Sequence, residues 1–289
     1  MRRLKSLVLY PTLVLALLFF HDSAAAARDR ATKTLVLRNG LAVMLIHDPE
    51  VHRSAAALAV GVGNLYDPEE KMGLAHYLEH MLFLGTKKYP VVDSFEKYLA
   101  ENSGTNNAYT GSAVTNYFIQ LSHEAFEGGL DRFSGFFKKP LLDKHYAERE
   151  VHAVDSEHQK NKLRDSWRVE LAMNQISEKG HPIRKFGTGN KETLVGDNRA
   201  ALLAFHDKYY VASRMKLAML SKADLSTQEW YARRYFGDIP DRPTEVPTVD
   251  PVYRQPLENG YRLMKIKTIR DTHKLTLEFP TIRLADHLE

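Results

Sequence analysis

The segment 76–80, with the sequence HYLEH, constrains the fold of this chain more than any other feature. Apolar residues recur at helical spacing through 73–84, and Gly85 is a suitable stop, so the pattern predicts a helix. Residues four apart lie on one face of a helix, about 6 Å from each other, so His76 and His80 can bind one metal ion. Glu79 projects beside that face, so it can reach a metal-bound water without itself binding the metal.

The motif by itself leaves two interpretations open. Its order, His-x-x-Glu-His, inverts a common zinc-binding motif, but a chance match has a probability on the order of a few per cent in a chain with 13 histidines. The pair could then be ordinary surface or core histidines. A hydrolytic zinc ion takes three protein ligands and leaves one position for water, so a third ligand is needed. Because the chain has no cysteine, that ligand must be a histidine or a carboxylate.

The segment 143–177 is where a third ligand is expected. It is rich in Glu, Arg, Lys, Ala and Leu and contains no Pro or Gly, which predicts one long helix. Glu150 and Glu157 lie seven residues apart, on one face of that helix, with Val154 between them. One of these carboxylates can bind the metal, and the other can support it.

Three segments together resemble a known family: HYLEHMLFLGTKKYP at 76–90, NNAYT at 106–110 and AVDSEH at 153–158. They are similar to the pitrilysin or insulinase-type zinc metallopeptidases, and the separation of the two metal segments also fits. The resemblance extends from about residue 34 to residue 279, and FGTGN at 186–190 belongs to it.

By position, the resemblance implies a zinc-dependent endopeptidase that hydrolyses peptides or small proteins, with one zinc ion as its cofactor. The carboxylate between the histidines would be the general base that activates a zinc-bound water. A second carboxylate would support the ligands, and the substrate peptide would add as an extra strand at a sheet edge. The implied residues are His76, His80 and Glu157 as zinc ligands, Glu79 as the base, Glu150 as the supporting acid, and Asn107 and Ala108 beside the substrate strand.

The remaining histidines and glycine strings carry little of the predicted chemistry. His152 stands where the family commonly has Asn, and it should point away from the metal because it lies five residues before Glu157. The strings GVG at 61–63 and GTG at 187–189 lack a nucleotide-binding fingerprint and are interpreted as turns. We interpret the following histidines as surface or packing residues: His123, His145, His181 and His206.

Outside the metal segments, the pattern predicts an α+β fold with a mostly antiparallel sheet packed by helices. A hairpin is expected around Asn39-Gly40, a pair suited to a tight turn. Further strands are expected at 54–62, 109–121 and 214–220, and a helix with an aromatic core face at 124–137. Two more helices are expected to open with capping boxes, Asp93 with Glu96 and Ser226 with Glu229.

The chain is expected to contain three regions: a signal peptide at 1–27, the catalytic domain at 28–250, and a linker with the incomplete start of a second, similar domain at 251–289. Five prolines between 239 and 256 indicate the linker. Strands are expected at 261–269 and 274–279, and two strands cannot enclose a core of their own. This leaves a second functional hypothesis, a zinc-binding fragment or partner subunit with little activity without its missing C-terminal half.

The N-terminus and the charge balance indicate where the chain acts and what it does not bind. Three positive charges in 1–5, an apolar stretch at 6–20 and small residues at 23–27 are typical of a secretory signal peptide. Because a spanning helix needs about 20 apolar residues, this stretch predicts no stable membrane anchor once the signal is removed. We therefore expect secretion across the inner membrane to the periplasm.

Forty basic and 36 acidic residues without a long basic run give no reason to expect that the chain binds nucleic acid.

Overall fold

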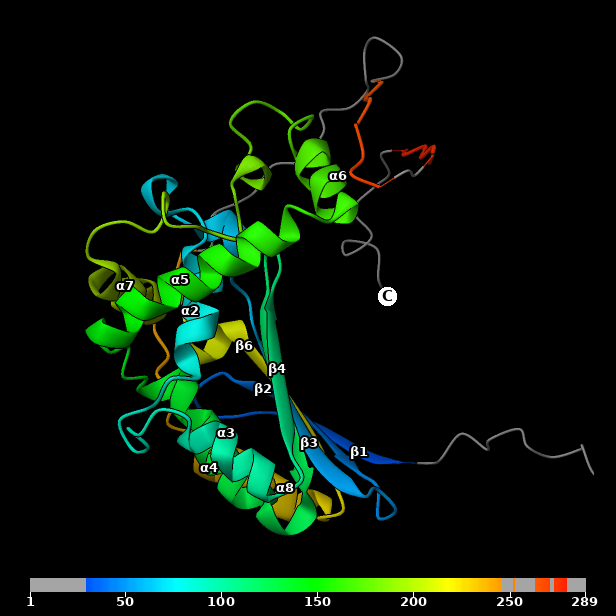
Figure 1. Ribbon diagram of the computed structural model, residues 1–289. Coiled ribbons are helices and arrows are strands. Elements are labelled where there is room, and N and C mark those ends of the chain that lie inside the picture. Colours follow the sequence, from blue (N-terminus) through cyan, green and yellow to red (C-terminus); the bar gives the residue numbers. More distant parts are fainter. Residues whose placement is uncertain (1–29, 246–251, 253–262, 271–272, 280–289) are drawn as a thin grey trace, which may run out of the picture.

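The computed structural model describes residues 30–245, 252, 263–270 and 273–279, so the predicted signal peptide lies outside it (Figure 1). No helix among these residues is long and apolar enough to cross a membrane. The strands are β1 (Ala31–Val36), β2 (Ala42–His47), β3 (Arg53–Val60), β4 (Thr105–Thr110), β5 (Thr115–Ser122) and β6 (Met215–Ser221). The helices are α2 (Leu74–Leu82), α3 (Ser94–Glu101), α4 (Phe126–Lys138), α5 (Lys144–Asn161), α6 (Asp165–Asn174), α7 (Asn198–Tyr209) and α8 (Leu225–Phe236).

The strands form one six-stranded sheet in the order β1-β2-β6-β3-β5-β4. All neighbouring strands are antiparallel except β2 and β6, which run parallel. The helices gather on one side of the sheet, and β4 is an edge strand (Figure 1). The predicted α+β fold with a mostly antiparallel sheet is therefore confirmed.

Side chains of β3 alternate between the two faces of the sheet, as a half-buried strand requires. Ser54, Leu58 and Val60 are buried toward the helices, whereas Ala55 and the other outward residues are partly exposed. The predicted hairpin before it is present, and Gly40 sits in its turn with φ +85°, a value that favours glycine. The sheet thus offers one apolar face on which the helices pack.

Helix α4 buries an aromatic stripe against that face, as the sequence predicts. Phe126, Phe133 and Phe137 are each at most 1% exposed, and the rings of Phe133 and Phe137 meet edge to face at 5.1 Å. Such pairs add to the hydrophobic burial of the rings themselves. The stripe is therefore core.

The prediction of one long helix over 143–177 is wrong, because the chain bends after Asn161 and forms two helices. No Pro or Gly causes the break, so local propensity gives no signal for it. The backbone closes a turn there, with Arg164 N donating to Asn161 O at 2.9 Å. The second helix, α6, then brings Trp167 back toward the last turn of α5, where both line one cavity. Tertiary packing has overridden helix propensity in this segment.

Several predicted boundaries also differ from the structure. The strand expected from 109 begins earlier, at Thr105, and a turn separates it from β5. Asp93 has φ +66° and makes no capping bond, so the first capping box is wrong. The second is wrong because Asp224 caps α8, accepting from Thr227 N at 2.7 Å. The described residues of the two expected late strands, 263–269 and 274–279, form no strand.

Candidate metal centre

Helix α2 presents the histidine pair, and Asp67 holds the start of this helix. The two carboxylate oxygens of Asp67 accept from Gly73 N at 2.7 Å and from Ala75 N at 2.8 Å. These are backbone donors that the first turn of a helix leaves without intrahelical partners. Burial raises the pKa of Asp67 to about 7, although both hydrogen bonds act in the opposite direction. The cap comes from a loop residue six positions before the N-cap Gly73, so no local capping motif reveals it.

Gly73 lets a distant loop approach the same helix. It has φ +92°, and a Cβ there would lie 2.2 Å from the Cα of Gly189, so no other residue fits. This close contact places the carbonyl of Thr188 beside His76. The His76 Nδ1–H donates to that carbonyl at 2.8 Å. The glycine-rich segment interpreted as a turn is therefore part of the site.

Helix α5 crosses α2 and is tied to it at two points. The Tyr77 hydroxyl donates to the carbonyl of Ala147, and both residues are buried. The His80 Nδ1–H donates to Glu150 Oε1 at 2.8 Å. These bonds set the distance between the helices and bring Glu157 opposite the histidine pair.

The three atoms expected to bind the metal form a nearly equilateral triangle. His76 Nε2 and His80 Nε2 are 3.3 Å apart, and each lies 3.5 Å from Glu157 Oε2. A tetrahedral zinc site with metal–ligand distances of about 2.0–2.1 Å has edges of about 3.3–3.4 Å. The donor set therefore fits zinc, and it is the one group of three such residues found among the described residues.

The outer hydrogen bonds also select the correct tautomer of both imidazoles. Because a carbonyl and a carboxylate can only accept, the Nδ1 atoms of His76 and His80 carry the protons. When both imidazoles are neutral, as metal binding requires, each Nε2 lone pair is directed toward the other two candidate ligand atoms. An outer partner that fixes the tautomer and orientation in this way is typical of histidines that bind metals.

Glu79 is buried next to the histidine pair, and its carboxylate is not among the three convergent ligand atoms found in the described part of the chain. Its side chain is 7% exposed, and Oε2 accepts a hydrogen bond from the Thr110 hydroxyl at the end of β4. Burial raises the pKa of Glu79, and the bond from Thr110 partly offsets this effect. A buried carboxylate with a raised pKa is suited to accepting and returning a proton.

The metal-free site holds opposite charges face to face. Although burial lowers the pKa of His80, hydrogen bonds with Glu150 and Glu157 raise it to about 9. The imidazoles of His76 and His80, each 3.5 Å away, hold the pKa of Glu157 well below its usual range. Metal binding must therefore displace a proton from His80.

The predicted substrate residues lie on a different element from the candidate metal ligands. Asn107 and Ala108 lie in the middle of β4, the edge strand that ends at Thr110. Asn107 Oδ1 accepts from Ala108 N at 2.9 Å, so the side chain covers a backbone donor of this strand. β4 also contacts α2, which places this edge beside the metal site.

The other histidines lie outside the triangle. His152 is exposed on α5, and the ring of His158 packs on Phe186 with centroids 4.6 Å apart. His123 bonds to Ser54, and His206 bonds to the carbonyl of Phe136. Among the described residues, three contributors to the site were missed from the sequence: Asp67, Thr110 and the carbonyl of Thr188. Thr110 lies in NNAYT and Thr188 in FGTGN, two segments of the family resemblance, whereas Asp67 lies in no segment that the sequence analysis singled out.

Comparison with known proteins agrees with this site. Residues 42–184 match the model described as Insulinase (Peptidase family M16), and residues 198–288 match the one described as Peptidase M16 inactive domain. The chain belongs to the insulinase family of peptidases. Zinc is the cofactor that the family and this donor set indicate.

The relatives are much longer than this chain. Insulin-degrading enzyme of Homo sapiens is 40% identical over 260 residues, which cover 87% of this chain and 26% of the relative. The A-factor-processing enzyme of Saccharomyces cerevisiae is 38% identical over 268 residues, covering 90% of this chain and 26% of the relative. The crystal structure of pitrilysin superposes with a TM-score of 0.76 at 38% identity, covering 79% of this chain and 25% of that one. The chain thus spans about a quarter of these proteins.

Proposed function

We propose that this chain is the catalytic zinc-binding part of a metalloendopeptidase that hydrolyses peptides or small proteins. The observation that carries the proposal is the triangle of His76 Nε2, His80 Nε2 and Glu157 Oε2, with edges of 3.3–3.5 Å and Glu79 beside it. His76, His80 and Glu157 would hold one zinc ion. When bound, zinc supplies a Lewis acid that polarises the scissile carbonyl and makes water easier to deprotonate.

Glu79 is assigned the proton transfers. Thr110 donates to Oε2, which leaves Oε1 to take a proton from the attacking water as its oxygen bonds to the carbonyl carbon. Glu79 then returns this proton to the peptide nitrogen as the carbon–nitrogen bond breaks, so the carboxylate is regenerated. No covalent bond between the chain and the substrate is required.

The substrate peptide is proposed to extend the sheet along β4, where Asn107 and Ala108 lie. An edge strand binds an extended peptide through backbone hydrogen bonds. Ala108 N is satisfied by the side chain of Asn107, which can turn away when a substrate carbonyl replaces it. Because Thr110 in the same strand contacts Glu79, a peptide bound here would run toward the base.

Hydrolysis of an internally quenched peptide by the purified chain tests this proposal. We expect cleavage that stops when a chelator removes the metal and returns when zinc is added. Bound zinc at one ion per chain without any cleavage would contradict activity of this chain alone.

That second outcome would favour a zinc-binding fragment or partner subunit that needs a further half. The observation in its favour is length, since the chain covers 26% of the human relative. Addition of a separately purified second half, taken from the coding sequence if it continues downstream, should then restore cleavage.

Export is a separate proposal, based on the signal peptide at 1–27. We propose secretion across the inner membrane to the periplasm, with cleavage near Ala26 or Ala27. Periplasmic extraction and N-terminal sequencing of the expressed chain would test it. A full-length chain confined to the cytoplasm, indistinguishable from a variant lacking 6–20, would contradict it.

A further inference from the structure

Each candidate histidine ligand is held by one hydrogen bond to an atom outside the metal site. The carbonyl of Thr188 holds His76, and the carboxylate of Glu150 holds His80. Glu157 is the most exposed of the three ligands, with 38% of its side chain accessible. A flexible, exposed carboxylate loses the most rotamer freedom on binding a metal, so a restraint matters most here.

Asn161 supplies a bond of this kind to Glu157. It lies one helical turn later in α5, and its Nδ2 donates to Glu157 Oε1 at 3.2 Å. Side chains four apart on a helix are neighbours, so the bond requires no distortion. Asn161 is only 5% exposed although it lies at the end of a largely exposed helix.

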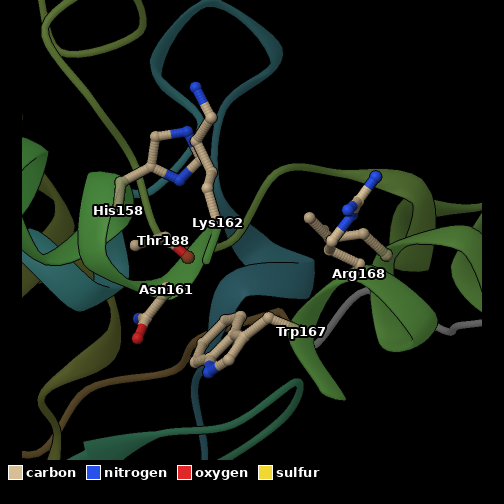
Figure 2. Close-up of a pocket in the computed structure, with 7 residues that line it drawn as sticks. His158, Asn161, Lys162, Trp167, Arg168 and Thr188 are labelled. Carbon is tan, nitrogen blue, oxygen red and sulfur yellow. The ribbon is translucent and has the colours of Figure 1, made fainter. Parts of the chain in front are cut away.

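The burial of Asn161 comes from α6, which folds back beyond the break in the helix. Trp167 and Asn161 line a cavity of about 210 Å³ that Thr188 also lines. Figure 2 shows the amide of Asn161 and the ring of Trp167 on one side of this turn, with Lys162 extending to the other. The Asn161 end of this hydrogen bond is therefore buried, whereas Glu157 stays partly exposed.

The chemistry of an amide suits this position. Its N–H group occupies Oε1 of Glu157 and leaves Oε2 directed at the two Nε2 atoms. A Lys or Arg side chain here would form an ion pair with the carboxylate and repel the metal. Lys162, the adjacent cation, donates instead to Gln159 Oε1 at 3.3 Å.

We propose that Asn161 is a positioning residue that orients Glu157 so that only Oε2 faces the metal. The inference rests on the proposed zinc site and adds a role for a residue outside it. It also gives a reason for the break after α5, since the turn brings Trp167 over the amide.

Zinc affinity of the whole chain, measured by competition with a chromophoric chelator, tests this role. Asn161→Leu keeps the approximate size of the side chain but removes the donor. We expect zinc binding to weaken about 10- to 100-fold, the usual effect of losing a partner of a metal ligand. Asn161→Gln can still donate and should stay closer to the unchanged chain. Asn161→Ala removes the donor without adding branched bulk, and gives the same test if the leucine variant does not fold.

Asn198→Leu is the matched control. Asn198 is also a buried helical asparagine, 8% exposed, and its Nδ2 donates to Leu194 O at 3.0 Å. Its Oδ1 also accepts from Lys71 Nζ at 2.9 Å, so Asn198→Leu removes at least as much hydrogen bonding as Asn161→Leu, away from the candidate ligands. The midpoint temperature of thermal unfolding of the metal-free protein should fall in both leucine variants. Only Asn161→Leu should lose zinc affinity.

Cobalt substitution gives a second readout that a general loss of stability would not change. A freed Glu157 carboxylate can bind through both oxygens, so the visible absorption of the cobalt form should weaken as the coordination number rises. Zinc affinity within twofold of the unchanged chain, with an unchanged cobalt spectrum, would overturn the role of Asn161 but leave the proposed function intact. An unchanged chain that binds no zinc at all would overturn both.

Discussion

The two helices that form the candidate metal centre differ sharply in how they are held. In α2, seven of nine residues are buried, and the helix contacts α5, α7, β4 and β5. In α5, four of 18 residues are buried. The first helix supplies both candidate histidine ligands and the proposed base, whereas the second supplies one candidate ligand, Glu157, and the outer partner Glu150.

This difference indicates how the site is built. The core fixes α2, so the spacing of His76 and His80 and the position of Glu79 are set by folding itself. Glu157 depends instead on local bonds between and within helices, from Tyr77 to Ala147, from His80 to Glu150 and from Asn161 to Glu157. Changes in α2 should therefore affect chemistry or folding, and changes in α5 should affect metal binding.

The largest effect is expected for Glu79→Gln. The amide cannot accept the water proton, so turnover should fall by about 10²- to 10⁴-fold, the usual contribution of a general base. Zinc content should stay at one ion per chain because Glu79 is not among the three convergent donors. Peptide hydrolysis and atomic emission on the same sample measure both. Normal hydrolysis would refute the assignment of the base.

Glu157→Gln should show the opposite pattern, loss of metal with an intact α2. The change removes the charged ligand from the more exposed helix, and we expect zinc affinity to fall by more than the roughly 10- to 100-fold typical of outer partners. Zinc content after dialysis measures it, with circular dichroism to show that the fold is kept. Unchanged zinc content would mean that another residue is the third ligand.

Leucine-to-alanine substitutions can compare the packing in α2 with the packing at the end of α5. Leu78 in α2 is 0% exposed and Leu163, just after α5, is 67% exposed. Leu78→Ala should destabilise the metal-free chain by about 2–5 kcal/mol through lost burial and a cavity. Leu163→Ala should change stability by less than about 0.5 kcal/mol. Urea denaturation measures both, and equal effects would remove the contrast between the helices.

Glu150→Gln should weaken the bond that joins the helices at His80. The amide can still accept from His80 Nδ1, but the negative charge that favours this tautomer is lost. Zinc affinity is expected to fall toward the lower end of the roughly 10- to 100-fold range, without loss of zinc at saturating concentration. Competition titration measures the shift. An effect as large as that of Glu157→Gln would make Glu150 a ligand itself.

The parts of the site that depend on local geometry could be predicted from the sequence. The histidine pair and Glu79 follow from helical spacing within five residues, and the turn at Gly40 follows from its Asn-Gly pair. Glu157 required the family resemblance, because α5 offers several acids and spacing alone left Glu150 and Glu157 open. The sheet was predicted as mostly antiparallel, but its strand order depends on contacts far apart in the chain.

The rest depends on tertiary contacts that no local pattern encodes. The partner of His76 is a backbone carbonyl 112 residues away, and a carbonyl has no sequence signature. The break after α5 has no Pro or Gly to signal it, and the turn there places Trp167 and Asn161 along one cavity. At α8, both Ser226 and Asp224 could cap the helix, and Ser226 instead donates to Asp224 Oδ1 at 2.8 Å.

The smallest effect is expected at His206 on α7, the helix that contacts both α2 and α5. Burial lowers the pKa of His206 from 6.5 to about 4. Between these two pH values, His206 is therefore protonated in the unfolded chain but stays neutral in the folded chain. Stability of the metal-free chain should therefore fall as the pH drops from 6.5 toward 4, with a contribution from this residue below about 1 kcal/mol at pH 6. His206→Gln can still donate to the carbonyl of Phe136 but cannot titrate, so its denaturation midpoint should depend less on pH. An identical pH dependence in His206→Gln would mean that α7 does not link stability to pH through this residue.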